Sequence, residues 1–141
     1  MIRFFSEDVD FSPSNESQLI RWLNSVAQDE QTEIAELSYI FCSDDYLLAL
    51  NQQYLNHDFY TDVITFDHRE QVSEPIVGDV FISYDRVIDN SQQLCLNESD
   101  ELNRVVLHGL LHLLGYGDTT SEEKDDMRLL EDKYLNNLRE T

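Results

Sequence analysis

The stretch LNRVVLHGLLHLL, residues 102–114, decides how this chain folds. Apart from an Asn-Arg pair and two histidines, its side chains are apolar or absent, so a helix formed here is apolar on nearly all of its faces. Such a helix is buried in a folded protein. The sequence Gly-Tyr-Gly at 115–117 follows directly, as is typical of a helix end. We therefore expect a buried helix at the centre of the domain.

The rest of the chain mixes strand and helix patterns around this segment. Alternating and β-branched residues predict strands over residues 2–5, 34–43, 62–67 and 78–84, the last two paired as a hairpin. Helical spacing predicts helices over residues 12–26, 44–55, 85–94 and 121–138. The pattern favours an α+β fold in which a single mixed β-sheet of about four strands packs with helices. A length of 141 residues predicts a single domain over 1–141.

Composition narrows the classes of function. Lys and Arg number 9 against 29 Asp and Glu, a net charge of −20, which argues against nucleic-acid binding through a broad cationic surface. The sequence has no apolar run of the roughly 20 residues that span a bilayer. Acidic residues interrupt the N-terminal segment after five residues, so we expect no signal peptide of the usual kind. Two cysteines lack a Cys-x-x-Cys spacing and are expected to be reduced. We expect a cytoplasmic protein with no membrane partner.

The two histidines of the central segment, His108 and His112, stand four residues apart. Residues at this spacing share a helix face, so both imidazoles can reach one metal ion. Asp118 follows beyond the glycine-rich turn and can fold over to complete a set of three ligands. Three protein ligands leave a fourth position for water, which is the pattern of a catalytic zinc. A metal at this site can activate water for attack on a carbonyl or phosphoryl centre.

Simpler roles for the same residues stay open at this point. The histidines can be core residues bonded to backbone carbonyls, and Asp118 can cap the last helix in competition with the capping box Thr120-x-x-Glu123. Zinc peptidases carry Glu directly after the first histidine as general base, whereas this chain has Gly109. A peptidase of that design is disfavoured. We expect Gly109 to let backbone or substrate approach the metal closely.

Three stretches, taken in order, resemble the YbeY-type endoribonucleases, a family also described as ribosomal RNA maturation factors. They are residues 50–54 with Asp58, residues 61–66 followed by 78–80, and residues 108–116. The resemblance implies a small α+β metalloprotein with a zinc-type site that acts on single-stranded RNA in small-subunit maturation and ribosome quality control. It also implies that His108 and His112 bind the metal. Asp118 stands where the family usually has a third histidine, and Leu55 where it commonly has arginine.

These observations lead to the hypothesis of a metal-dependent endoribonuclease with one Zn²⁺, or another divalent transition metal, held by His108, His112 and Asp118. Asp58, Asp62 and His57 are the candidates for further catalytic groups, with solvated turn residues as the alternative. The expected partners are ribosomal RNA and basic small-subunit ribosomal proteins; no DNA is expected.

Two other functions stay open on the sequence. The first is an acidic, non-catalytic ribosome-assembly adaptor with a structural metal, which the net charge of −20 suits. The second is hydrolysis of a small metabolite or an amide, which the residue types alone permit.

Overall fold

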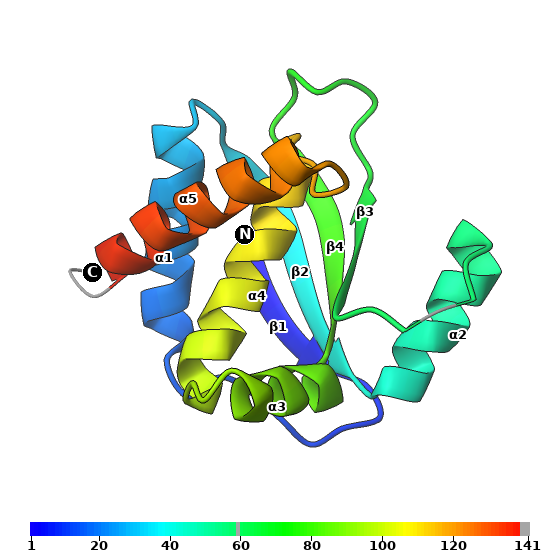
Figure 1. Ribbon diagram of the computed structural model, residues 1–141. Helices are drawn as coiled ribbons and strands as arrows, with labels where there is room; N and C mark the ends of the chain where they lie inside the picture. Colours follow the sequence, from blue (N-terminus) through cyan, green and yellow to red (C-terminus); the bar gives the residue numbers. More distant parts are fainter. Residues whose placement is uncertain (59, 139–141) are drawn as a thin grey trace.

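The computed structural model describes residues 1–58 and 60–138 (Figure 1). Its first half contains β1 (Ile2–Ser6), α1 (Glu16–Asp29), β2 (Ile34–Cys42) and α2 (Asp44–Leu55). Its second half contains β3 (Val63–Asp67), β4 (Ile76–Ser83), α3 (Tyr84–Gln93), α4 (Glu98–Leu113) and α5 (Ser121–Leu138). One mixed sheet with helices packed around it confirms the predicted α+β fold.

The strands of the sheet lie in the order β1-β2-β4-β3. Strands β1, β2 and β4 are parallel, while β3 pairs with β4 in the antiparallel sense, with Thr65 opposite Val80. The predicted hairpin is therefore confirmed, and it places β3 at one edge of the sheet. The edge matters for function because α4 also packs against β3 and β4.

Helix α3 begins at Tyr84, one residue earlier than expected. Its N-cap is Ser83, whose hydroxyl accepts a hydrogen bond from the backbone N–H of Arg86. Asp85 does not cap this helix; its carboxylate accepts from the backbone N–H of Asp44 at 2.9 Å. Asp85 thereby ties the start of α3 to the start of α2.

The core lies mainly between one face of the sheet and helices α1, α3, α4 and α5 (Figure 1). Alternate residues of β2 (Leu37, Tyr39 and Phe41) point into it and are fully buried. A smaller cluster of Cys42, Leu47 and Ile64 lies under α2. Cys42 and Cys95 are both free thiols. Among the described helices, none combines the length and apolarity needed to cross a bilayer.

Helix α4 is the central, largely buried helix that the sequence predicts, although it starts earlier, at Glu98. The Asn97 side chain caps that start by accepting from the backbone N–H of Asp100. Gly109 lies against β4: a Cβ there would be 2.5 Å from Cγ1 of Val80. The close approach expected at Gly109 is thus made by a core strand, and the prediction that backbone or substrate uses it to reach the metal is wrong.

Candidate metal centre

One face of α4 carries four polar side chains at helical spacing: Glu101, Arg104, His108 and His112. This face lies toward α5 and the turn that precedes α5. The two imidazole rings are nearly perpendicular, at 88°, and their Nε2 atoms lie 2.9 Å apart. The spacing of the histidines therefore converges on one point beside the helix, as predicted.

Asp118 reaches the same point from the turn that follows α4. Gly115 adopts a φ of 107°, a conformation that glycine tolerates, and the chain reverses there. The Oδ2 atom of Asp118 lies 3.1 Å from Nε2 of His108 and 3.4 Å from Nε2 of His112. One ligand atom from each of the three residues falls within 4.8 Å of the others. The structure thus brings together the three residues that the sequence singled out.

The competing role of Asp118 as a helix cap does not occur. The start of α5 is capped by Thr120 and Glu123: the Thr120 hydroxyl accepts from the Glu123 backbone N–H, and the Glu123 carboxylate accepts from the Thr120 N–H. This is the capping box that the sequence predicts. The carboxylate of Asp118 instead lies against the two histidines, and the Asp118 side chain is 41% exposed.

The other ring nitrogen of each histidine has an acceptor of its own. The Nδ1 atom of His108 lies 2.7 Å from Oε2 of Glu131, and Nδ1 of His112 lies 2.9 Å from the carbonyl oxygen of Tyr116. These acceptors require Nδ1–H donors, so in the neutral imidazoles each Nε2 carries a lone pair. Two facing lone pairs and a carboxylate repel unless a proton or a metal ion lies among them. The donor set, two imidazoles and a carboxylate, fits a divalent transition metal.

Glu131 is a residue of the site that the sequence analysis missed. It lies on α5, with its side chain 6% exposed, and pairs with His108 and with Arg104, whose Nη1 is 3.4 Å from Oε1. The buried Glu101 in turn binds the Arg104 guanidinium through both carboxylate oxygens. A signal for Glu131 does exist: it stands at helical spacing within the row of buried α5 residues Met127, Tyr134 and Leu138.

These carboxylates set the electrostatics of His108. Burial by itself lowers the pKa of the His108 imidazole, but the hydrogen bond that His108 donates to Glu131 and the negative charges of Glu131, Asp62 and Asp118 outweigh it. The pKa of His108 is consequently raised above its ordinary value. The site therefore favours positive charge at the point where the three ligand atoms converge.

The remaining predicted residues are distributed around this centre. Asp62 is half-buried and close enough for its charge to act on His108. Asp58 is exposed and accepts a hydrogen bond from Nε2 of Gln52 at 2.6 Å. His57 is also exposed and lines a pocket that His112 shares. The structure thus brings Asp62 and His57 to the site's surroundings, while Asp58 lies in an exposed turn.

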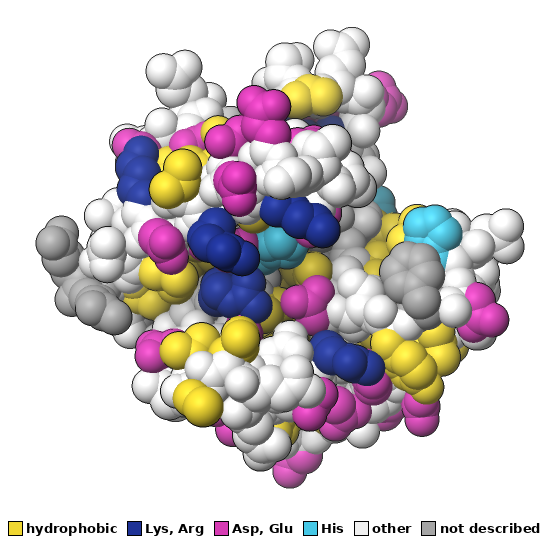
Figure 2. Space-filling view, viewed as in Figure 1, with side chains coloured by type: hydrophobic (Ala, Val, Ile, Leu, Met, Phe, Trp, Pro, Cys, Tyr) yellow, Lys and Arg dark blue, Asp and Glu magenta, His cyan; other side chains and the backbone are white. Residues whose placement is uncertain are grey.

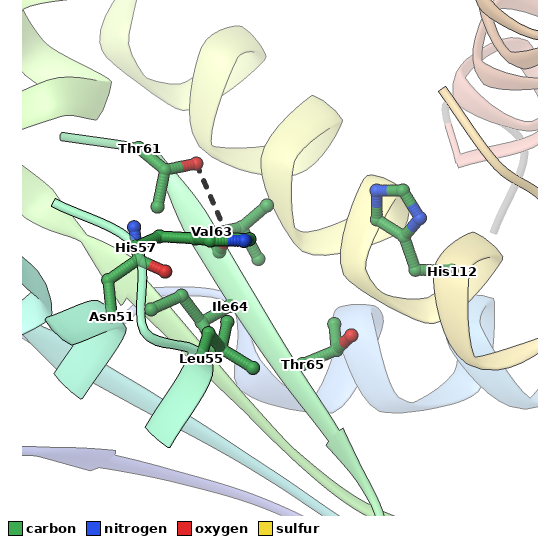
Figure 3. Close-up of a pocket in the computed structure, with 8 residues that line it drawn as sticks. All are labelled: Asn51, Leu55, His57, Thr61, Val63, Ile64, Thr65 and His112. Carbon is green, nitrogen blue, oxygen red and sulfur yellow. Dashed lines mark hydrogen bonds between the residues drawn. The ribbon is translucent and has the colours of Figure 1, made fainter. Parts of the chain in front are cut away.

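That pocket, of about 240 Å³, opens between α2 and β3 (Figure 3). Thr61 and Thr65 lie along one wall, Leu55 and Asn51 come from α2, and His112 reaches in from α4 on the opposite side. Its full lining is Asn51, Leu55, His57, Thr61, Val63, Ile64, Thr65 and His112. No Lys, Arg, Asp or Glu is among these residues. Leu55 therefore contributes no positive charge to this pocket.

Comparison with known proteins assigns the chain to a family. The family model described as "Endoribonuclease YbeY" matches residues 1–139. Proteins named endoribonuclease YbeY from Cytophaga hutchinsonii and Porphyromonas gingivalis are 52% and 41% identical over 134 and 140 residues. These matches cover 95% and 99% of this chain, and 93% and 91% of the relatives.

A solved structure agrees with this assignment. The solution structure of TM1509 from Thermotoga maritima is similar with a TM-score of 0.67 at 27% sequence identity. The match covers 98% of this chain and 89% of that one. The family model and the curated relatives show that the chain belongs to the YbeY endoribonuclease family.

Proposed function

We propose that this chain is a zinc-dependent endoribonuclease that cleaves single-stranded ribosomal RNA during maturation and quality control of the small ribosomal subunit in the cytoplasm. Membership of an endoribonuclease family supports an RNA substrate. The observation that carries the metal dependence is the convergence of His108 Nε2, His112 Nε2 and an Asp118 oxygen, with both Nδ1 atoms already bonded elsewhere.

His108, His112 and Asp118 would hold the ion, one per chain. Zinc is the metal we favour, because two imidazoles and a carboxylate with a fourth position left open are a ligand set of catalytic zinc sites. When bound, the ion supplies Lewis acidity to the phosphodiester and lowers the pKa of a water molecule. Glu131 and the Tyr116 carbonyl oxygen hold the two imidazoles in the orientation that points Nε2 at the ion.

Asp62 is the residue we propose as proton acceptor for the attacking water. Its charge acts on His108, so it lies near the reacting centre, and it is half-buried. A general base must reach the water directly or through one further water. His57, which is exposed and lines the pocket, is assigned instead to substrate contact. Asp58, whose carboxylate accepts from Gln52 and which does not line the pocket, is given no catalytic role.

The uncharged pocket beside His112 supports a preference for single strands. It combines apolar side chains, such as Leu55 and Val63, with hydrogen-bonding groups, such as Asn51 and Thr65. An unstacked base offers both an apolar face and polar edges, whereas bases in a duplex are stacked and paired. A pocket of about 240 Å³ thus suits one base splayed out of a single strand.

The net charge of −20 bears on how the protein meets its substrate. Long-range repulsion slows association of an acidic protein with RNA. We propose that basic small-subunit ribosomal proteins offset this repulsion by binding the acidic surface and bringing the chain to ribosomal RNA. In the alternative function, a non-catalytic ribosome-assembly adaptor, the acidic surface binds the same basic proteins but the chain does not cleave RNA.

The test combines metal content with cleavage. Elemental mass spectrometry of tag-free protein is expected to give about one zinc per chain, lost in His112→Ala and retained in His68→Ala, an exposed histidine paired with Asp79. Wild type should cleave a single-stranded RNA oligonucleotide, spare the same RNA in a duplex, stop in chelator and recover with zinc.

Absence of metal after a failed reloading would overturn the proposed metal site. Full metal content with no RNA cleavage, together with retained binding to small-subunit ribosomal proteins, would overturn the nuclease proposal in favour of the adaptor.

A further inference from the structure

Two cations on α5, Lys124 and Arg128, lack acidic partners. Both side chains are exposed, and neither comes within 4.0 Å of a carboxylate of residues 1–58 and 60–138. The chain has 29 acidic and only 9 basic residues. Four other basic side chains each pair with a carboxylate: Arg69, Arg86, Arg104 and Lys133.

Both cations lie beside the candidate metal centre. They line a cavity of about 230 Å³ whose other walls include His108, Asp118 and Glu131. Figure 2 shows several Lys and Arg side chains gathered near a His side chain on the face of the molecule formed by α4 and α5. The pocket on the His112 side, by contrast, has no Lys or Arg in its lining. Of these two pockets, only the one on the His108 side is lined by cations without ion pairs.

The local structure of α5 gives no reason for this pair of charges. Lys124 and Arg128 are four residues apart, and like charges at that spacing disfavour a helix. Lys124 also lies within the first turns of α5, where the helix dipole favours negative charge and Glu122 and Glu123 supply it. Neither cation makes an ion pair with a residue that the structure describes. A ligand that carries negative charge would pair with both.

Taking the proposed function as given, we propose that Lys124 and Arg128 bind the backbone phosphates of single-stranded RNA that flank the cleaved bond on the His108 side. Ammonium and guanidinium groups are the usual partners of phosphate oxygens, and such contacts position a strand irrespective of its sequence. The strand then crosses the centre, with phosphates over α5 and a base in the uncharged pocket beside Leu55. Because the rest of the protein is acidic and repels RNA, these contacts hold the RNA at the metal centre.

The test compares two double variants that lose the same number of charges. Lys124→Gln/Arg128→Gln removes the proposed contacts, while Arg3→Gln/Arg21→Gln removes two exposed cations without ion pairs on β1 and α1. Zinc-loaded proteins are titrated, at several salt concentrations, with a fluorescent single-stranded RNA whose linkages are phosphorothioates, which keep the negative charge and slow hydrolysis. Cleavage kinetics with the unmodified RNA follow.

For single strands the slope of log K against log salt is about −0.7 per phosphate neutralised. We expect the slope of the first variant to be smaller than wild type by about 1.4, and each single substitution to reduce it by about 0.7. KM should rise while kcat is retained, because contacts with the flanking phosphates lie beside the reacting atoms and hold the RNA equally in the ground state and the transition state. The Arg3/Arg21 variant should keep the wild-type slope and KM.

Equal slopes and equal KM values for the two double variants would overturn the inference while leaving the nuclease proposal intact. A wild-type protein that holds zinc but neither binds nor cleaves RNA would overturn the proposed function itself, and the inference with it.

Discussion

Glu131→Gln isolates the contribution of a buried carboxylate that touches a proposed metal ligand without binding the metal. Its Oε2 accepts a hydrogen bond from Nδ1–H of His108 at 2.7 Å, and its side chain is 6% exposed. The substitution keeps the size of the side chain and removes the charge. Arg104 keeps its bidentate partner Glu101, so the guanidinium is not left buried and alone.

The expected loss is in zinc affinity. A carboxylate on Nδ1 orients the ring and makes Nε2 a better electron donor, and removal of such a partner weakens metal binding by about 10- to 100-fold. This corresponds to about 1.4–2.8 kcal/mol of binding free energy. Glutamine retains an acceptor oxygen, so we expect about tenfold for Glu131→Gln and a larger loss for Glu131→Ala.

The measurement is competition with a chromophoric zinc chelator, with circular dichroism to check that the fold is retained. Glu123→Gln is the matched control: it removes one charge from the same helix at a carboxylate that caps α5. We expect its zinc affinity to stay within twofold of wild type. Zinc affinities of Glu131→Gln and Glu123→Gln that agree within twofold would refute the reasoning about Glu131.

Three further predictions concern the fold. Gly109→Ala should lower the free energy of unfolding by about 1–3 kcal/mol in urea titrations, since the new Cβ would lie 2.5 Å from Val80; Val80→Ala in the same chain should restore much of it, and no rescue would count against this contact. The hydrogen bond from Arg69 lowers the pKa of Asp67 below 3.8, so Asp67 contributes stability above that pH and loses it as pH falls through the folded value; the stability gap between wild type and Asp67→Asn should therefore close below about pH 3.8, and a constant gap would contradict this. Burial raises the pKa of Cys42 to about 12, so at pH 8 a thiol reagent should modify one cysteine per folded chain and two after unfolding; two fast thiols in the folded chain would be inconsistent with it.

Features that depend on residues close together in the chain were predictable. The apolar segment around His108 and His112 determined the central helix, because only a buried position removes so much apolar surface from water. The spacing of the two histidines determined that they share a helix face. The capping box of Thr120 and Glu123 was predictable because its two hydrogen bonds span only three residues.

Features that depend on contacts between distant segments were decided by the tertiary structure. Glu131 reaches His108 across 23 residues, and only the packing of α5 on α4 creates that contact. Gly109 faces Val80 because α4 packs on β4. The position of Gly109 next to His108 in the sequence is equally compatible with an open space beside the metal. The position of Lys124 and Arg128 beside His108 follows from the same packing.

Local sequence patterns therefore identify the residues that can bind a metal and the strands that form the sheet, and the composition gives the net charge. The packing of the elements places Glu131 against His108, Gly109 against Val80, and Lys124 and Arg128 beside the site. The physical reason is that helical and strand periodicity relate residues a few positions apart. Contacts between helices depend instead on how whole faces pack, which no local spacing specifies.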